Sequence, residues 1–155
     1  SYNGWGDVLV IIFFGFVPVG GTYYVQALTW TPDVTIASFI CGLLIDTLLV
    51  VNNYRDREAD ARSGKRNVIV RFGEKFGRYF YLLLGISASL LCLYFLGEGH
   101  IYAALLPQLY LVPHVLTWRR MVKIHSGKKL NSILGETSRN MLFMGVLIAI
   151  GMLVS

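Results

Sequence analysis

The sequence predicts an all-α, multi-pass transmembrane helical bundle, and three observations support this prediction. Fifty-five per cent of the 155 residues are hydrophobic and only 15% are charged, whereas a soluble domain is about a quarter charged. The apolar residues form long uninterrupted blocks, unlike the periodic pattern of helices that show one face to water. The basic residues are confined to two of the connections between blocks. We therefore expect an integral membrane protein.

Five apolar blocks are expected to span the bilayer, at residues 8–27, 34–51, 79–96, 101–118 and 136–154. The first is a run of 20 residues without a charge, which suits a hydrocarbon core about 30 Å thick. The last is long enough only if its helix begins near Glu136 and carries Arg139 and Asn140 at its rim. Cys41 and Cys92 lie inside blocks and are interpreted as small hydrophobic packing residues.

The basic residues predict the orientation of the chain. Eight of the 14 Lys and Arg residues lie between Arg55 and Arg78, and the other six lie between Arg119 and Arg139. By the positive-inside rule, the loops 52–78 and 119–135 face the cytoplasm. A net charge of +5 can indicate nucleic-acid binding, but this placement is typical of membrane topology, so we expect no nucleic-acid partner.

An acidic pattern begins where the second predicted span ends. If the helix continues past residue 51, Asn52, Asp56 and Asp60 stack on one face, in a stripe about 80° wide, while Arg55 points away from it. Oxygen ligands of this kind suit Mg²⁺, and zinc is disfavoured because no Cys or His lies at ligand spacing. The alternative interpretation is a solvated loop held by salt bridges.

Cationic residues follow the acids, and one acid lies deeper in the span. Lys65 and Arg66 belong to a loop that can hold diphosphate oxygens. Asp46 lies inside an apolar block, near the helical sector of Asn53 and Asp60. Because an ionisable residue at membrane depth normally faces a bundle interior or a watery cavity, we expect a polar cavity that opens toward the cytoplasm. Alternatively, Asp46 pairs with another helix.

The scarcity of ionisable residues inside the spans weighs against a transport function. A transport pathway predicts ionisable residues in several spans, and only Asp46 lies in the middle of one. His114 could line a cavity, but the favoured interpretation is that it is hydrogen-bonded inside the bundle.

The segment NNYRDREADARSGK, Asn52–Lys65, resembles the second aspartate-rich motif of the UbiA-type intramembrane prenyltransferases, and within them of the 1,4-dihydroxy-2-naphthoate polyprenyltransferases. Residues 4–24 and 127–147 are similar to two helical regions of the same family. The resemblance implies a nine-helix fold with two aspartate-rich motifs at the cytoplasmic mouth of a central cavity. Residues 1–155 contain one such motif and five predicted spans. We therefore expect the C-terminal half of the domain, helices 5–9, which needs its N-terminal half as a partner and is inactive alone.

The resemblance also implies an activity. It is the Mg²⁺-dependent transfer of a polyprenyl chain from polyprenyl diphosphate to 1,4-dihydroxy-2-naphthoate with decarboxylation, giving demethylmenaquinone, at the lipid bilayer of a bacterial inner membrane. Alternatives are a different aromatic acceptor or a non-enzymatic transporter bundle. Asp56 and Asp60 would be the catalytic metal ligands. The residues expected to contact substrate are Asn52, Asn53, Lys65, Arg66 and Asp46.

Overall fold

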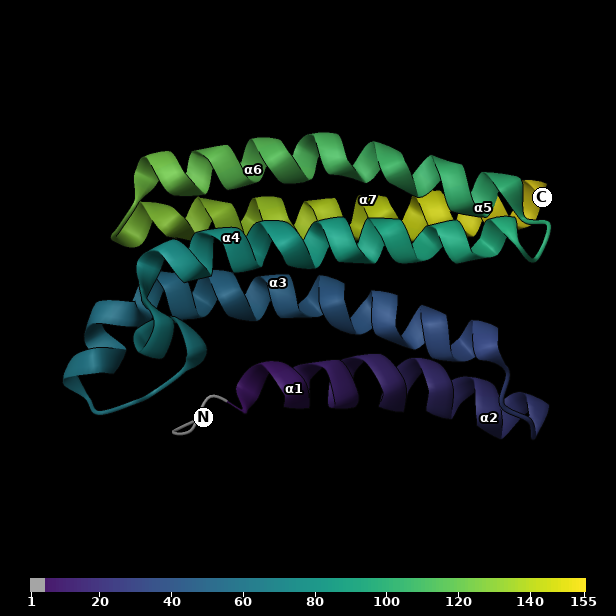
Figure 1. Ribbon diagram of the computed structural model, residues 1–155, viewed down its shortest axis with the longest axis horizontal. Coiled ribbons are helices and arrows are strands. Elements are labelled where there is room, and N and C mark those ends of the chain that lie inside the picture. Colours follow the sequence, from purple (N-terminus) through teal and green to yellow (C-terminus); the bar gives the residue numbers. More distant parts are fainter. Residues whose placement is uncertain (1–4) are drawn as a thin grey trace.

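The computed structural model describes residues 5–155, and the chain in this range is helical except for short connections (Figure 1). The segments are α1 (Gly6–Val10), the π-helix η1 (Ile11–Gly20), α2 (Gly21–Ala27), α3 (Pro32–Arg62), α4 (Val68–Leu91), η2 (Cys92–Leu96), α5 (Ile101–Leu105), η3 (Leu106–Tyr110), α6 (Leu111–Ile124), η4 (Lys128–Leu130) and α7 (Asn131–Val154). Several of these join end to end, so that the described residues form five long helices. The prediction of an all-α bundle is confirmed.

Four helices in the described part of the chain are long and apolar enough to cross a membrane: Gly6–Ala27, Pro32–Arg62, Val68–Leu96 and Lys128–Val154. The predicted span 101–118 lies in a fifth helix, built from α5, η3 and α6. This helix contains Pro107, Gln108 and His114, which make it less apolar than the other four.

The helices extend beyond the spans expected from the sequence, most clearly α3, α4, α6 and α7. Helix α3 has 31 residues and is therefore about 46 Å long, so the end that carries Asp56 and Asp60 projects past a hydrocarbon core of about 30 Å. Helix α7 begins at Asn131 rather than near Glu136. Asn140, which we expected at the membrane rim, is buried. It donates hydrogen bonds to Thr117 Oγ1 (2.9 Å) and to the carbonyl oxygen of Pro113 (3.3 Å).

The polar end of α3 is stopped by a glycine turn. Gly64 has φ +77°, a conformation in which glycine avoids the Cβ penalty. The backbone N–H of Lys65 then donates to the carbonyl oxygen of Asp60 (3.0 Å), as in a Schellman-type helix end. Asn67 begins the next helix, because its Oδ1 accepts hydrogen bonds from the N–H groups of Ile69 and Val70, both at 3.0 Å. This turn brings α4 back against α3.

The helices pack on both sides of α3. Figure 1 shows the helix made of α1, η1 and α2 alongside α3, with α4, α6 and α7 on its other side. The close approach of η1 depends on Gly15 and Gly42. A Cβ at Gly42 would lie 2.9 Å from Ile11 Cα, and one at Gly15 would overlap the Ser38 carbonyl oxygen. Beneath the polar end of α3 lies an apolar core that fixes its position: Val50, Val51, Tyr54, Ile69, Tyr81, Leu84, Met121, Leu130 and Ile133.

Candidate functional site

Asp60 is held at the polar end of α3 by two neighbours from the following turn. Its Oδ2 accepts a hydrogen bond from Asn67 Nδ2 at 3.0 Å, and its Oδ1 lies 3.2 Å from Lys65 Nζ. The Asp60 side chain is 14% exposed. Because Asn67 also caps α4, the start of that helix and the Asp60 carboxylate are fixed by one side chain. The salt bridge between Asp60 and Lys65 is the contact that the alternative interpretation, a loop held by salt bridges, expects; diphosphate binding by Lys65 stays a prediction.

Asp60 opens onto a small polar cavity of about 90 Å³ between α1 and α3. Asn53 and Lys65, both singled out from the sequence, line it as well. Its lining residues are Gly6, Asp7, Leu49, Asn53, Asp60, Lys65 and Asn67. Asp7 was not among the residues expected from the sequence.

Asp56 lies one helical turn before Asp60 but has a different partner. Its two carboxylate oxygens accept hydrogen bonds from Arg55 Nε (2.8 Å) and Nη2 (2.7 Å), and its side chain is 44% exposed. The hydrogen bonds from Arg55 lower the pKa of the Asp56 carboxyl, against the opposing effect of partial burial. Arg55 was expected to point away from the acids, but it turns back along the helix onto its neighbour. Its Nη1 also donates to Asn131 Oδ1 at 2.9 Å.

The other predicted residues are more dispersed. Asn52 is half-buried and Arg66 is exposed, and neither lines the polar cavity. Asp46 is fully buried, and neither of its carboxylate oxygens has a hydrogen-bond partner. It lies on α3 three residues before Leu49, which lines the polar cavity, and does not line that cavity itself.

A network of charged side chains holds the polar ends of three helical segments together. Tyr54 OH donates to Glu74 Oε1 (2.8 Å) and accepts from Arg78 Nε (3.0 Å). Glu74 also pairs with Arg78 and lies 2.6 Å from His125 Nδ1. Arg57 completes the network, with Nη2 at 3.5 Å from Glu74 Oε2. These residues join α3, α4 and the end of α6. Their charged groups are paired with one another, so we assign them a structural role.

His114 has the structural role that the sequence favoured. It is fully buried, with Nδ1 at 3.0 Å from Tyr110 OH and Nε2 at 3.3 Å from the Leu82 carbonyl oxygen. Its ring stacks on those of Tyr81 and Tyr110. The expectation that His114 is hydrogen-bonded inside the bundle is confirmed.

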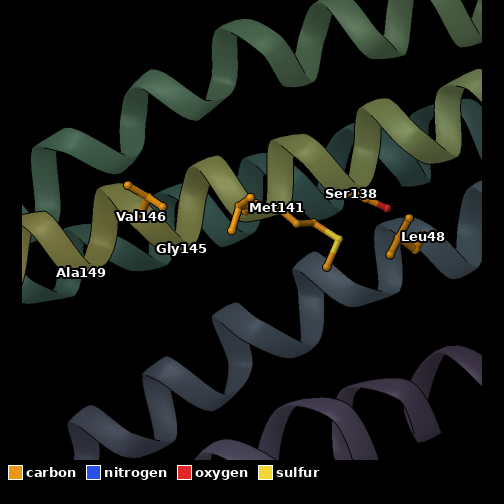
Figure 2. A pocket seen from close by; sticks show the side chains of 7 residues that line it. Leu48, Ser138, Met141, Gly145, Val146 and Ala149 are labelled. Carbon is orange, nitrogen blue, oxygen red and sulfur yellow. The ribbon is translucent and has the colours of Figure 1, made fainter.

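Apolar grooves run along α3 beside the polar site. One, of about 490 Å³, lies between α3 and α7 and is shown in Figure 2. Leu48 faces Met141 and Ser138 across it. A second, of about 330 Å³, is lined by apolar side chains from η1, α3 and α7, among them Cys41 and Ile45. Positions 41, 45, 48, 52 and 56 follow at helical spacing, so the groove side of α3 leads to Asn52 and Asp56.

The donor set is compatible with a hard divalent cation. Asp60, Asn53 and Asp7, whose side chains carry oxygen atoms, line one cavity, and Asp7 Oδ1 is buried without a hydrogen-bond partner. Within residues 5–155, no group of three or more His, Cys, Asp or Glu side chains lies close enough to hold a metal unaided. Mg²⁺ does not require such a group, since it usually keeps several waters and binds one or two carboxylates together with substrate phosphate.

Comparison with known proteins identifies the family. The profile of the UbiA prenyltransferase family matches residues 1–144. The chain belongs to the UbiA prenyltransferase family. This membership and the four apolar helices establish an integral membrane protein.

The curated relatives narrow the comparison. The 1,4-dihydroxy-2-naphthoate octaprenyltransferases of Escherichia coli and Haemophilus influenzae are each 40% identical to this chain, over 60% and 59% of its length and 30% of theirs. The UbiA prenyltransferase domain-containing protein 1 of Dictyostelium discoideum is 29% identical over the whole chain and 46% of its own length. The chain thus spans about a third to a half of these relatives. No solved structure matches it.

Proposed function

We propose that the full-length protein transfers a polyprenyl chain from polyprenyl diphosphate to 1,4-dihydroxy-2-naphthoate, with loss of the ring carboxyl group as carbon dioxide. Two 40%-identical relatives that carry this substrate in their names support the proposal. A relative named 2-carboxy-1,4-naphthoquinone phytyltransferase, from Synechocystis, is 28% identical. A naphthalene-type acceptor is common to these names, whereas they differ in the prenyl group.

The observation that carries the proposal is the adjacency of two environments on α3. Asp60, Asn53 and Lys65 line a polar cavity, while another side of the same helix borders apolar grooves at Leu48 and Ile45. Asn52 and Asp56 line neither groove, but they follow Leu48 at helical spacing. A polyprenyl diphosphate has the same division, with a charged head and a long apolar tail. The grooves suit the tail, and the cationic and amide side chains suit the head.

The residues of this chain have distinct parts in the proposed reaction. Lys65 binds diphosphate oxygens, and Arg66 adds positive charge at the loop. Asn52 and Asn53 orient the diphosphate by hydrogen bonds. The carbon–oxygen bond then breaks, diphosphate leaves with the electron pair, and the electron-rich ring carbon that carries the carboxylate forms a bond to the allylic carbon. The carboxylate leaves as carbon dioxide, and the electron pair of the broken carbon–carbon bond restores the aromatic ring. Apolar walls exclude water that would otherwise capture the cationic carbon.

Asp56 and Asp60 are the proposed holders of Mg²⁺. When bound, the ion neutralises charge that develops on the leaving diphosphate. Arg55 holds the Asp56 carboxylate ionised and fixed, while Asn67 and Lys65 do so for Asp60. The proposal places these groups at the cytoplasmic end of α3, in a bacterial inner membrane. Asp46 lies deeper in α3 than the residues that line the cavity.

The proposal is tested with the full-length protein in membranes, supplied with Mg²⁺, a polyprenyl diphosphate and carboxyl-labelled dihydroxynaphthoate. We expect prenylated product and labelled carbon dioxide from the parent. Asp56→Ala and Asp60→Ala should each lose about 100-fold or more, since one charge contact in a transition state contributes several kcal/mol. Glu58→Ala is the control, because Glu58 lies on the same helix and its side chain is 68% exposed. Unchanged turnover in both aspartate variants would contradict the assignment.

A further inference from the structure

Asp7 is a buried acid that belongs to no aspartate-rich motif. It lies on α1, is only 7% exposed, and lines the polar cavity opposite residues of α3. Its Oδ1 atom is buried and has no hydrogen-bond partner. A buried polar atom without a partner costs about 1–3 kcal/mol, and more when it is charged. The position of Asp7 therefore needs an explanation other than fold stability.

The fold holds Asp7 in place through the rest of its helix. Helices α1, η1 and α2 follow one another without a break, and η1 packs on α3 at the close contact of Gly15 with Gly42. Asp7 lies about two turns before Gly15 on this continuous helix. Its carboxyl group is therefore directed at the cavity by helix packing and not by a flexible terminus.

The charges around the cavity do not balance. Asp7 and Asp60 are the acids that line the cavity and Lys65 is its cation, so two carboxylates face one positive charge. Lys65 lies on the Asp60 side, 3.2 Å from Oδ1. Both oxygens of Asp46 and one oxygen of Asp7 lack a partner. A mobile cation would offset this excess directly, whereas water would satisfy the hydrogen bonds but leave the charge.

The size and chemistry of the cavity fit a partly hydrated divalent ion. A volume of about 90 Å³ has room for an ion and several waters. Asp7 lines it from α1, and Asp60 and Asn53 line it from α3. Two carboxylates and one amide, completed by water, form the kind of incomplete protein shell that Mg²⁺ prefers.

We propose that Asp7 is a ligand of a divalent cation in this cavity, together with Asp60 and Asn53. The inference deepens the proposed function, since it adds to that site a ligand from a second helix. Lys65 is then free to move from Asp60 to a phosphate oxygen when the substrate enters. The bound cation would thereby link α1 to α3.

The test measures cation binding in the absence of substrate. The full-length protein in detergent is titrated with Mn²⁺, a spectroscopic substitute for Mg²⁺, and free Mn²⁺ is followed by electron paramagnetic resonance. Asp7→Asn preserves the size of the side chain, so its thermal unfolding without metal should match that of the parent or rise. We expect its Mn²⁺ dissociation constant to increase about tenfold or more, as with other changes in a metal shell.

The matched control is Asp33→Asn, at the opposite end of α3, where Asp33 Oδ1 accepts a hydrogen bond from Tyr94 OH at 2.9 Å. It should bind Mn²⁺ like the parent. Parent-like binding by Asp7→Asn, with weakened binding by Asp60→Asn, overturns this inference and leaves the proposed function intact. Absence of Mn²⁺ binding by the parent overturns the inference as well, while the turnover assay decides the proposed function separately. Weakening by Asp33→Asn equal to that by Asp7→Asn also overturns it.

Discussion

Polar side chains are buried in two regions of this bundle, and the two regions differ in their hydrogen bonding. Between α4, α6 and α7, the buried side chains of Tyr81, His114 and Asn140 each hydrogen-bond to a neighbouring helix, and Tyr110 bonds His114. At the seam of α1 and α3, oxygens of Asp7 and Asp46 have no partner. A polar group can be buried when it has hydrogen-bond partners. The polar side chains of the first region therefore have a structural role.

The difference separates stability from function. Polar side chains with hydrogen-bond partners specify how the helices pack. Buried polar groups without partners cost stability and are typical of functional sites. The second region adjoins Asp60 and Lys65, the residues that the sequence motif singles out. Substitution of the hydrogen-bonded side chains in the first region should therefore lower the free energy of unfolding. Substitution of the unpartnered acids in the second region, Asp7 and Asp46, should lower it little or even raise it.

The largest expected effect on stability is in the satisfied region. His114→Ala removes a stacked ring and two hydrogen bonds, and should destabilise the protein by about 2–4 kcal/mol. The measurement is thermal unfolding in detergent, followed by circular dichroism. His100→Ala, at the start of α5 where the side chain is half-buried, is the control. Equal unfolding temperatures for the two variants would remove the distinction between the regions.

A smaller loss is expected from the close contact that holds the seam together. In Gly42→Ala the new Cβ would lie 2.9 Å from Ile11 Cα, so the η1 backbone must shift, at a cost of about 1–3 kcal/mol. Gly135→Ala is the matched control, because a Cβ at Gly135 meets nothing within 4 Å. It should be neutral or slightly stabilising. If Gly42→Ala unfolds at the parent temperature, the seam is not held by close packing.

The seam also shows what could and could not be predicted from the sequence. Helical spacing predicted a stripe of Asn52, Asp56 and Asp60 with Asn53 near it. Asn53 and Asp60 line the polar cavity, whereas Asn52 and Asp56 do not. Asp7 was missed because its own helix shows no polar stripe, and only tertiary packing directs it toward Asp60. Arg55 was misplaced because a helical wheel gives the direction of Cβ, while a long side chain can turn back to the next residue.

A change of opposite sign is expected at Asp46. Asp46→Asn replaces a buried carboxyl group whose two oxygens lack partners with an uncharged amide of the same size. We expect the unfolding free energy to rise by up to about 1–2 kcal/mol, because a buried ionisable group without hydrogen-bond partners is replaced by one that cannot ionise. Thermal unfolding without added divalent cation is the measurement. A loss of more than about 1 kcal/mol would indicate that Asp46 has a partner and that the two regions are alike.

The smallest effect on stability is expected from Arg55→Gln, which breaks the pair with Asp56. The two side chains are 27% and 44% exposed, and an exposed ion pair contributes about 0–1 kcal/mol. Arg55 lowers the pKa of Asp56 from its ordinary 3.8. The stabilisation is therefore complete above pH 3.8 and is lost as the pH falls through the lower pKa of the folded state.

This dependence makes the comparison quantitative for the exposed end of α3. The difference in unfolding temperature between parent and Arg55→Gln should be small and constant from pH 7 to pH 5, and should shrink below pH 4. A hydrogen bond from Arg55 to Asn131 leaves a remainder that does not depend on pH. The rate of prenyl transfer should fall by a larger factor than the small change in unfolding free energy corresponds to, because the variant releases the carboxylate that Arg55 holds in place. If the rate of prenyl transfer falls no further than the loss of folded protein explains, the pair stabilises the helix end and does not position Asp56.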